Sequence, residues 1–481
     1  MKETILKELD FLKSQQVDYA DIRFIDRQRE NISTENLEVQ NINNSRSRGF
    51  GIRVILNGSL GFASTQSIDK LHHTAEKALE IAKASRILQK EKMVLAPKDI
   101  VQDHYSTPIE IDPFTIPKNE KIRLLLDAEK AMQNSANLCR TQGSLDFQKE
   151  EKVFADTEGS YITQTLFESG GGIVAFAEGN GDTQMRSYPN SFRGNHGTAG
   201  YEFVTNMDFV GNAPKIAKEA EALAHAEECP SGYFDVVIDS SQLTLQVHES
   251  VGHPVELDRT LGSEAAYAGM SFVTVDKLNE NFKYGSEHVT IVADATCATG
   301  LGTFGYDDDG VKGQRTVIID KGIFKNFISS RDTASKIGSV SNGTNRADGF
   351  YNIPIVRMSN INLMPGNFEL EELFDGIKYG FYLCTNKSWS IDDKRLNFQF
   401  ATEIAYEIKD GKLTGKVFKN PIYTGITPEF WGSCDGVCSE KYWKLYGTPN
   451  CGKGQPGQTA HVGHGTAPAR FRNVKVGVKD V

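Results

Sequence analysis

Long hydrophobic runs are missing from this chain. None of its apolar stretches is long enough to cross a bilayer, and the charged, amphipathic start from Met1 to Leu9 lacks the apolar core of a signal peptide. Basic runs are missing too, and the formal net charge is −10 with a pI near 5.6. These absences predict a cytoplasmic protein with no membrane partner and no direct nucleic-acid partner.

Cysteine is also scarce. The seven cysteines of the chain lie at positions 139, 229, 297, 384, 434, 438 and 451. An odd number at irregular spacing favours reduced thiols over a disulfide framework. The segment Cys451-Gly452-Lys453-Gly454 lacks the Gly-x-x-x-x-Gly-Lys-Ser/Thr spacing of a phosphate-binding loop, so a site of that kind is not expected.

The chain is long enough to form several folded domains. Of its 481 residues 39% are hydrophobic, which is ordinary for a soluble globular protein. Three prolines fall within residues 105–117, which predicts a linker there. We expect an α+β fold with an N-terminal α+β domain over 1–105, a middle α+β segment over 118–230 and a mostly β C-terminal domain over 231–481.

Short strands are predicted in both N-terminal segments. In the first segment, Asn57-Gly58 predicts a type I′ hairpin turn at the end of a series of strands that cover residues 19–25, 30–34, 37–42 and 49–56. In the second segment, Glu158-Gly159 and the run Gly170-Gly171-Gly172 are expected to interrupt the strands.

The most informative pattern is His248-Glu249-Ser250-Val251-Gly252-His253. Zinc peptidases commonly carry His-Glu-x-x-His on a helix, where the two imidazoles share one face and the Glu acts on a metal-bound water. Here the second histidine comes one residue later, and at about 100° per residue the pair is roughly 140° apart around a regular helix. Because Gly252 relaxes the backbone and Pro254 disfavours helical geometry at His253, we expect the helix to bulge or end there, which returns His253 towards His248.

The flanking sequence predicts a rigid support for this motif. Residues 233–239 favour a buried strand, and Asp239-Ser240-Ser241 favours the start of a helix. Leu243, Val247 and Val251 then recur as one apolar stripe of an amphipathic helix. The first two residues of the motif lie beside that stripe, near the end of the helix.

Two histidines do not complete a catalytic zinc site, which normally has three protein ligands and one open position for water. The candidates for the third ligand are Cys434, Cys438, Cys451, His461 and His464. The Cys434 and Cys438 pair could also form a second metal site, although no other pair at zinc-finger spacing accompanies it. Spacing alone leaves the third ligand open.

Several ordered motifs resemble the TldD/PmbA family, once described as modulators of DNA gyrase. The resemblance covers nearly the whole chain. It is carried by Ala20–Phe24, Ser47–Val54, Gly61–Thr65, the 248–253 motif with Glu256 and Asp258, Tyr306–Gly310, Asn342–Arg346, Pro354–Asn360, Cys451–Gln455 and Val462–Pro468. TldD-like members carry His-Glu-x-x-x-His and act as zinc peptidases, whereas PmbA-like partners lack it, and this chain is similar to the former.

The resemblance implies roles for residues of the site. It assigns His248, His253 and Cys451 as ligands of one zinc ion and Glu249 as the catalytic carboxylate, which takes a proton from water and passes it to the leaving amine. Glu256 and Asp258 are candidates for fixing the orientation of the imidazoles, or are simply solvated acids. The candidates for substrate contact or oxyanion stabilisation are Tyr306, His461 and His464.

The resemblance also implies paired subunits around an internal cavity, as a homodimer or as a heterodimer with a PmbA-like partner. The substrates would then be unstructured peptides. Two other functions stay open, a non-enzymatic binding protein with a structural zinc site and a zinc amidase acting on small molecules. The presence of Glu249 favours an enzyme, because a closed structural site gains nothing from a general base.

Overall fold

Long antiparallel strands dominate the N-terminal half of the fold. The computed structural model describes residues 1–133, 135, 137–191 and 193–477, so the last four residues of the predicted C-terminal domain lie outside the described part. The sheet has the order β3-β2-β1-β5-β6-β4, with β7 and β8 also paired to β6. Strands from both sides of the predicted linker therefore share one sheet. The bounds are β1 (Tyr19–Glu35), β2 (Glu38–Leu56), β3 (Ser59–Thr65), β4 (Gln102–Ser106), β5 (Leu138–Asp156), β6 (Tyr161–Gly179), β7 (Asp182–Tyr188) and β8 (Asn195–Gly197).

The prediction of short strands at the start of the chain was wrong. The expected strands 19–25 and 30–34 are one continuous strand, β1, and the next two are joined in β2. Polar residues between the predicted strands do not form turns, because their side chains pair across the sheet. Arg27 Nε donates to Glu150 at 2.5 Å and Arg29 Nε donates to Gln148 at 2.7 Å. The hairpin turn at Asn57-Gly58 is confirmed, with φ of 53° and 79°.

The glycine run 170–172 does not interrupt β6, contrary to expectation. These residues lie where β8 pairs with β6 and the residues just before β8 pack closely against it. A Cβ on Gly170 would lie 2.2 Å from the ring of His196, and one on Gly172 would lie 2.5 Å from Gly194 Cα. The glycines therefore permit close packing within a continuous strand.

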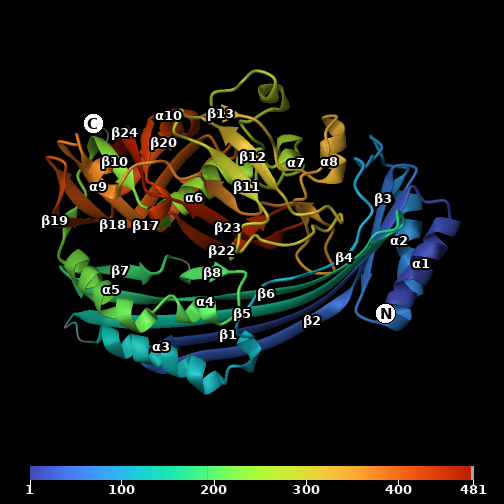
Figure 1. The fold of residues 1–481 in the computed structure, drawn as a ribbon, viewed down its shortest axis with the longest axis horizontal. Coiled ribbons are helices and arrows are strands. Elements are labelled where there is room, and N and C mark those ends of the chain that lie inside the picture. Colours follow the sequence, from blue (N-terminus) through green and yellow to red (C-terminus); the bar gives the residue numbers. More distant parts are fainter. Residues whose placement is uncertain (134, 136, 192, 478–481) are drawn as a thin grey trace.

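Helices cover the outer face of the long sheet in two groups (Figure 1). One group packs at the end that holds the N-terminus, where its apolar residues form a core with Ile22, Phe24 and Ile52. The other packs near the opposite end, against Leu145, Phe147 and Ile173. The first group is α1 (Lys2–Ser14) and α2 (Leu71–Ser85), and the second is α3 (Lys118–Met132) and α5 (Phe209–Ala224), with the short α4 (Glu202–Thr205) nearby.

The C-terminal half lies on the concave face of the long sheet (Figure 1) and has a mostly β architecture. Its main sheet has the order β17-β10-β24-β20-β18-β19-β9 and closes on itself, because β17 also pairs with β18. The bounds are β9 (Glu227–Glu228), β10 (Gly232–Ile238), β17 (Tyr379–Ile391), β18 (Asn397–Lys409), β19 (Lys412–Lys419), β20 (Ile422–Ile426), β21 (Cys434–Val437) and β24 (Ala469–Val476). The predicted α+β class with a mostly β C-terminal region is confirmed.

Smaller elements complete the C-terminal half around one hydrophobic core. The buried helix α6 (Ser240–Val247) packs between β17 and the hairpin of β22 (Lys444–Lys453) and β23 (Gln458–Thr466). The remaining elements are β11 (Ile291–Asp294), β12 (Arg315–Asp320), β13 (Ile323–Phe324), β14 (Asn345–Arg346), β15 (Ile355–Val356), β16 (Ile361–Leu363), α7 (Leu257–Thr260), α8 (Arg331–Lys336), α9 (Leu370–Phe374) and α10 (Thr427–Gly432).

Buried ion pairs join the C-terminal half to the long sheet. Asp309 accepts from Arg53 at 2.6 Å, and Asp308 lies 2.7 Å from Lys152. Burial alone would raise the pKa of Asp308, but Lys152 and Arg23 lower it to about 2. Asp308 and Asp309, in the Tyr306–Gly310 segment of the family resemblance, therefore bind the C-terminal half to the long sheet.

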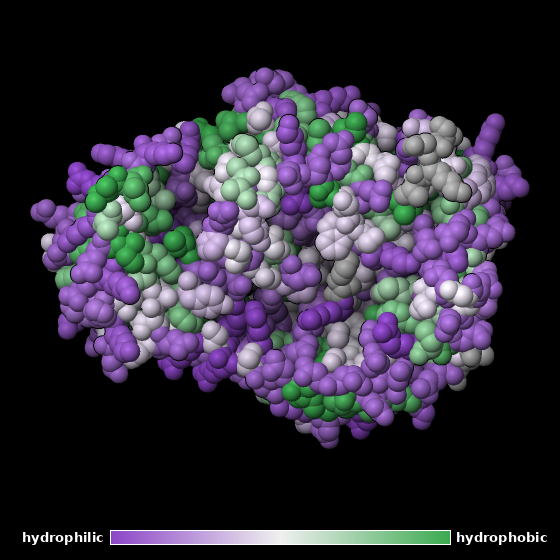
Figure 2. Space-filling view, turned by 180° about the vertical axis from the view of Figure 1, so that it is seen from behind, coloured by the Kyte–Doolittle hydropathy of each residue, from purple (hydrophilic) through white to green (hydrophobic). Residues whose placement is uncertain are grey.

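One face of the molecule is mainly polar. On the face seen in Figure 2, hydrophilic residues cover most of the molecule and apolar residues form small separate groups. Within the part of the chain that the structure describes, no helix has the length and apolar character needed to span a membrane.

Candidate metal centre

The predicted distortion after α6 takes the form of a π-turn. Residues His248–Gly252 form the turn, and the backbone N–H of His253 donates to the carbonyl of His248. Such a turn accommodates one extra residue, so positions i and i+5 come to the same face. The prediction that the helix bulges between the two histidines is confirmed. Asp239 caps the start of α6, as predicted, by accepting from the backbone N–H of Ser241 at 2.9 Å.

Buried polar contacts hold the π-turn in place. The carbonyl of Ser250 accepts from the Tyr284 hydroxyl at 2.5 Å, and its hydroxyl oxygen accepts from the Trp431 indole at 2.9 Å. Gly252 lies against Met358, where an added Cβ would come within 2.2 Å of the sulfur. The Tyr284 bond satisfies the carbonyl of Ser250, which a regular helix would leave unpaired because residue 254 is a proline without an N–H.

The turn brings His248 and His253 together with Cys451. One potential ligand atom from each residue lies within 4.8 Å of the other two, and all three residues are buried. Cys451 Sγ and His253 Nε2 are 3.7 Å apart. Around a tetrahedral zinc ion, a nitrogen ligand and a sulfur ligand are about 3.6 Å apart, so this spacing fits zinc.

Hydrogen bonds orient both imidazoles with Nε2 towards the cluster. His464 donates from Nδ1 to the carbonyl of Ile361 at 3.2 Å, which leaves its Nε2 to accept from Nδ1 of His248 at 2.7 Å. On the other side, His253 Nδ1 bonds to Glu256 at 2.9 Å. Each ring therefore keeps an Nε2 lone pair for a metal ion, the arrangement that such partners commonly impose.

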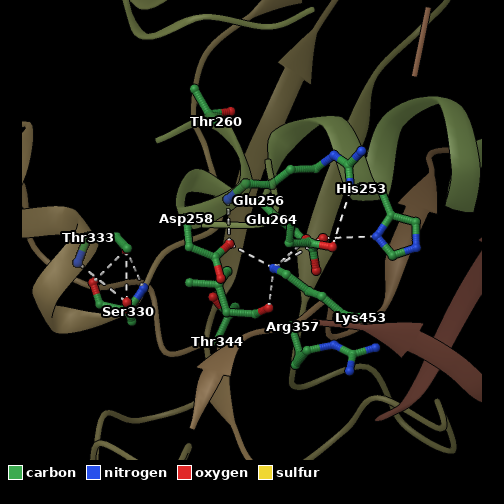
Figure 3. A network of polar contacts seen from close by, with 12 residues as sticks. His253, Glu256, Asp258, Thr260, Glu264, Ser330, Thr333, Thr344, Arg357 and Lys453 are labelled. Atoms are coloured by element: carbon green, nitrogen blue, oxygen red, sulfur yellow. Dashed lines mark hydrogen bonds and ion pairs between the residues drawn. The ribbon is translucent and has the colours of Figure 1, made fainter. Parts of the chain in front are cut away.

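A buried lysine lies among the acidic residues that follow His253 in the chain (Figure 3). Lys453, two residues after Cys451, lies 2.7 Å from Asp258, 3.3 Å from Glu256 and 3.8 Å from Glu264. Glu256 thus bonds to His253 and to the lysine, whereas Asp258 bonds to the lysine and is linked to His253 through it. Both candidates are buried, so they are not solvated acids.

Cys451 belongs to the hairpin of β22 and β23, at a register shift after Thr448. Arg357 fixes its backbone, with Nη2 donating to the carbonyl of Cys451 at 2.5 Å. Burial alone would raise the pKa of this thiol, but Arg357 and His253 lower it. Burial lowers the pKa of His248 and of His464, so both imidazoles favour the neutral form, which His248 requires to bind a metal ion and His464 requires to accept from His248.

Glu249 faces a cavity beside the three residues. The cavity has a volume of about 290 Å³, and its lining includes His248, Glu249, His253 and Cys451. The Glu249 carboxylate accepts from Arg395 Nη1 at 2.6 Å and from the side chain of Trp389. Burial alone would raise the pKa of Glu249, but the histidines and Arg395 lower it, so the carboxylate form is favoured.

The other sequence candidates lie apart from the cavity. Tyr306 donates to Asp103 at 2.5 Å, and His461 bonds to Glu168 at 2.5 Å in a neighbouring polar groove. Cys434 and Cys438 are buried in the core of the C-terminal half. His464 lies behind His248 and is fully buried. Arg395 and Trp389 could not be identified from the sequence, because they come from a distant hairpin without a recognisable motif.

The cluster predicts which cysteine binds metal. Cys451→Ser should remove most of the zinc from the purified protein, because a hydroxyl is a far weaker zinc ligand than a thiolate. Cys434→Ser and Cys438→Ser are matched controls that should keep about one zinc per chain. Elemental analysis of the three variants would measure this, and zinc loss in Cys434→Ser alone would contradict the assignment.

Comparisons with known proteins cover the whole fold. The protein-family model for the PmbA/TldA metallopeptidase C-terminal domain matches residues 231–478. The models for domain 1 and for the central domain match residues 20–82 and 111–227. A solved structure described as a modulator of a DNA gyrase, from Thermotoga maritima, covers 99% of this chain with a TM-score of 0.76 at 16% identity. At 16% sequence identity, this structural similarity shows a shared fold alone.

Curated relatives match over most of their length. A metalloprotease of Methanothermobacter thermautotrophicus is 31% identical over 96% of this chain and 96% of its own. One from Methanocaldococcus jannaschii is 30% identical over 93% of this chain and 94% of its own. The metalloprotease TldD homolog of Haemophilus influenzae is 27% identical, over 99% of this chain and 96% of its own. With these relatives and a family model spanning more than half of its residues, the chain belongs to the PmbA/TldD family of metallopeptidases.

Proposed function

We propose that this chain hydrolyses peptide bonds with one zinc ion held by His248, His253 and Cys451. The observation that supports this most strongly is the convergence of three buried ligand atoms within 4.8 Å of one another, beside the Glu249 carboxylate in a cavity. A relative from Saccharolobus solfataricus, 28% identical over 51% of this chain, is described as a zinc metalloprotease TldD homolog.

Each residue of the site has a defined task in this reaction. A zinc ion at the cluster would lower the pKa of a bound water and polarise the scissile carbonyl. As the oxygen of the attacking water bonds to the carbonyl carbon, Glu249 accepts a proton from that water. Glu249 then delivers the proton to the leaving nitrogen as the C–N bond breaks. His464 and Glu256 keep the imidazoles in place throughout.

The shape of the site favours flexible peptide substrates. The cavity beside Glu249 shares Pro449 and Asn450 with an adjoining polar groove of about 680 Å³ above the long sheet. The groove is lined by both acidic and basic side chains, including Arg29, Asp146 and Glu168. A folded protein is too large to enter, whereas an extended chain can bind through its main-chain groups with little demand on sequence.

The edge of the long sheet supports a paired assembly. Strand β3 pairs only with Phe50–Leu56 of β2, so residues 38–49 of β2 have no strand partner on that side among the described residues. In an antiparallel pairing with a second copy, Glu38 can face Arg46 or Arg48, which is favourable across strands. We propose that this edge pairs with another copy or with a PmbA-like partner.

A structural zinc site is the less favoured alternative. Structural sites normally have four protein ligands, and the cluster formed by the described residues has three. The carboxylate of Glu249 also faces the cavity, where it can reach a substrate. A zinc amidase for small molecules shares this chemistry, and substrate tests distinguish it.

Glu249→Gln should separate metal binding from chemistry. Because Glu249 is proposed as a base and not as a ligand, the variant should keep normal zinc content and folding but lose hydrolysis of an unfolded protein by about 100-fold or more. Glu151→Gln, which changes a carboxylate that is 55% exposed, is the control and should retain activity. Full activity in Glu249→Gln would refute the mechanism.

We expect dimerisation of the chain to control which substrates reach the zinc site. Light scattering should give a dimer for the unsubstituted protein and a monomer for Ile42→Lys, because a lysine on an open strand edge opposes pairing. The dimer should cleave casein and an unfolded substrate at several sites but spare the same substrate in its folded form. If both forms were cleaved equally, or if a monomer were fully active, the proposal that substrates reach the zinc site through a groove enclosed by the dimer would be contradicted. Cleavage of small amides alone would favour the amidase function.

A further inference from the structure

The guanidinium of Arg395 lies beside the proposed general base, Glu249. Its Nη1 donates to Glu249 at 2.6 Å, and the residue lines the same cavity as the proposed metal ligands. Histidines apart, Arg395 is the one basic residue among the described residues that line this cavity. A positive charge next to a general base, in a partly enclosed cavity, can act strongly on negative charge that develops in a substrate.

The backbone around Arg395 is held rigidly in the turn between β17 and β18. Arg395 adopts a left-handed conformation, with φ of 61°, and its N–H donates to the carbonyl of Asp392 at 2.9 Å. Its carbonyl accepts from the Thr427 hydroxyl at 3.0 Å. Arg259 donates to the carbonyl of Asp393 at 2.7 Å, and the N–H of Phe272 donates to the carbonyl of Lys394 at 2.9 Å. The left-handed conformation is common for the last residue of a hairpin turn, and the bonds from Thr427, Arg259 and Phe272 fix the position of this turn beside the cavity.

The guanidinium also keeps donor capacity for a ligand. Arginine has five N–H donors, and the contact with Glu249 is made through Nη1. The Nε of Arg395 is buried and has no hydrogen-bond partner among the described residues. The side chain as a whole is 17% exposed and lines the cavity, so further N–H groups on its terminal nitrogens can donate to a bound molecule.

We propose that Arg395 is a further catalytic residue, one that stabilises the oxyanion of the tetrahedral intermediate. This inference rests on the proposed peptidase function. As the water oxygen bonds to the carbonyl carbon, the electron pair of the C=O bond moves to oxygen, and the guanidinium donates to that oxygen. When the C–N bond breaks, the pair returns to restore the carbonyl, and the proton held by Glu249 passes to the leaving nitrogen. Arg395 itself gains and loses no proton.

Two other roles for Arg395 make different predictions. If the residue anchored the terminal carboxylate of a substrate, its loss would raise KM only for peptides with a free C-terminus. If its contact with Glu249 served as a resting lock, its loss would increase kcat. An oxyanion role instead places the effect on kcat, whatever the C-terminal group of the peptide.

The test compares Arg395→Met, Arg395→Lys and the control Lys394→Met, an exposed residue in the same turn. Arg395→Met should lower kcat by about 100- to 1000-fold, the usual effect of removing an oxyanion donor, with KM and zinc content nearly unchanged. Peptides with free and amidated C-termini should be affected equally. Arg395→Lys should recover part of the loss through its charge, and Lys394→Met should match the unsubstituted protein.

A binding measurement gives a readout that does not depend on turnover. A phosphinic peptide carries a tetrahedral anionic group, and calorimetry should show that it binds about 100-fold more weakly to Arg395→Met than to Lys394→Met. The proposal would be overturned if Arg395→Met showed unchanged binding together with unchanged kcat, or an increased kcat. It would also be overturned if the effect were confined to peptides with a free carboxylate, or if the variant lost its zinc. No hydrolysis by the unsubstituted protein would overturn the proposed function itself, while the phosphinic peptide would still report on Arg395.

Discussion

Two histidines five residues apart cannot share a metal ion on a regular helix, so the helix between them must either end or take an extra residue into one turn. The π-turn at His248–Gly252 meets this requirement, and the site is built around it. Tyr284 and Trp431 bond to Ser250 at the centre of the turn, and the close approach of Met358 leaves no space for a side chain at position 252. A regular helix in the same place would turn the second imidazole away from the first and from Cys451.

The polar groups behind the cluster link elements that are distant in the chain. Lys453 joins the hairpin that carries Cys451 to the acids that follow His253, and His464 on the same hairpin supports His248. On the cavity side, the hairpin of β17 and β18 supplies Arg395 and Trp389 to Glu249. The position of each residue of the proposed site therefore depends on packing within the C-terminal half, while the long sheet forms the floor of the adjoining groove, where we propose that a peptide enters.

Local sequence rules predicted the supporting helix, its cap and its distortion, because Asp239, Gly252 and Pro254 act on the backbone near them. The same rules divided β1 and β2 into short strands, because polar residues that pair across a sheet resemble turns when read singly. The glycines of β6 were predicted to interrupt the strand, because their close packing against β8 cannot be recognised from the sequence. Choosing Cys451 over Cys434 required a family resemblance, and Arg395 could not be found without the fold, because its partner Glu249 is 146 positions away.

The direct test of the central claim is the coordination of the metal itself. X-ray absorption at the zinc edge of the purified protein should show one sulfur ligand at about 2.3 Å and two imidazole nitrogens at about 2.0–2.1 Å, with the remaining position taken by a light atom. This is the result expected if the π-turn presents His248 and His253 to the same ion as Cys451. A first shell without sulfur, or with two or more sulfur atoms, would contradict the account.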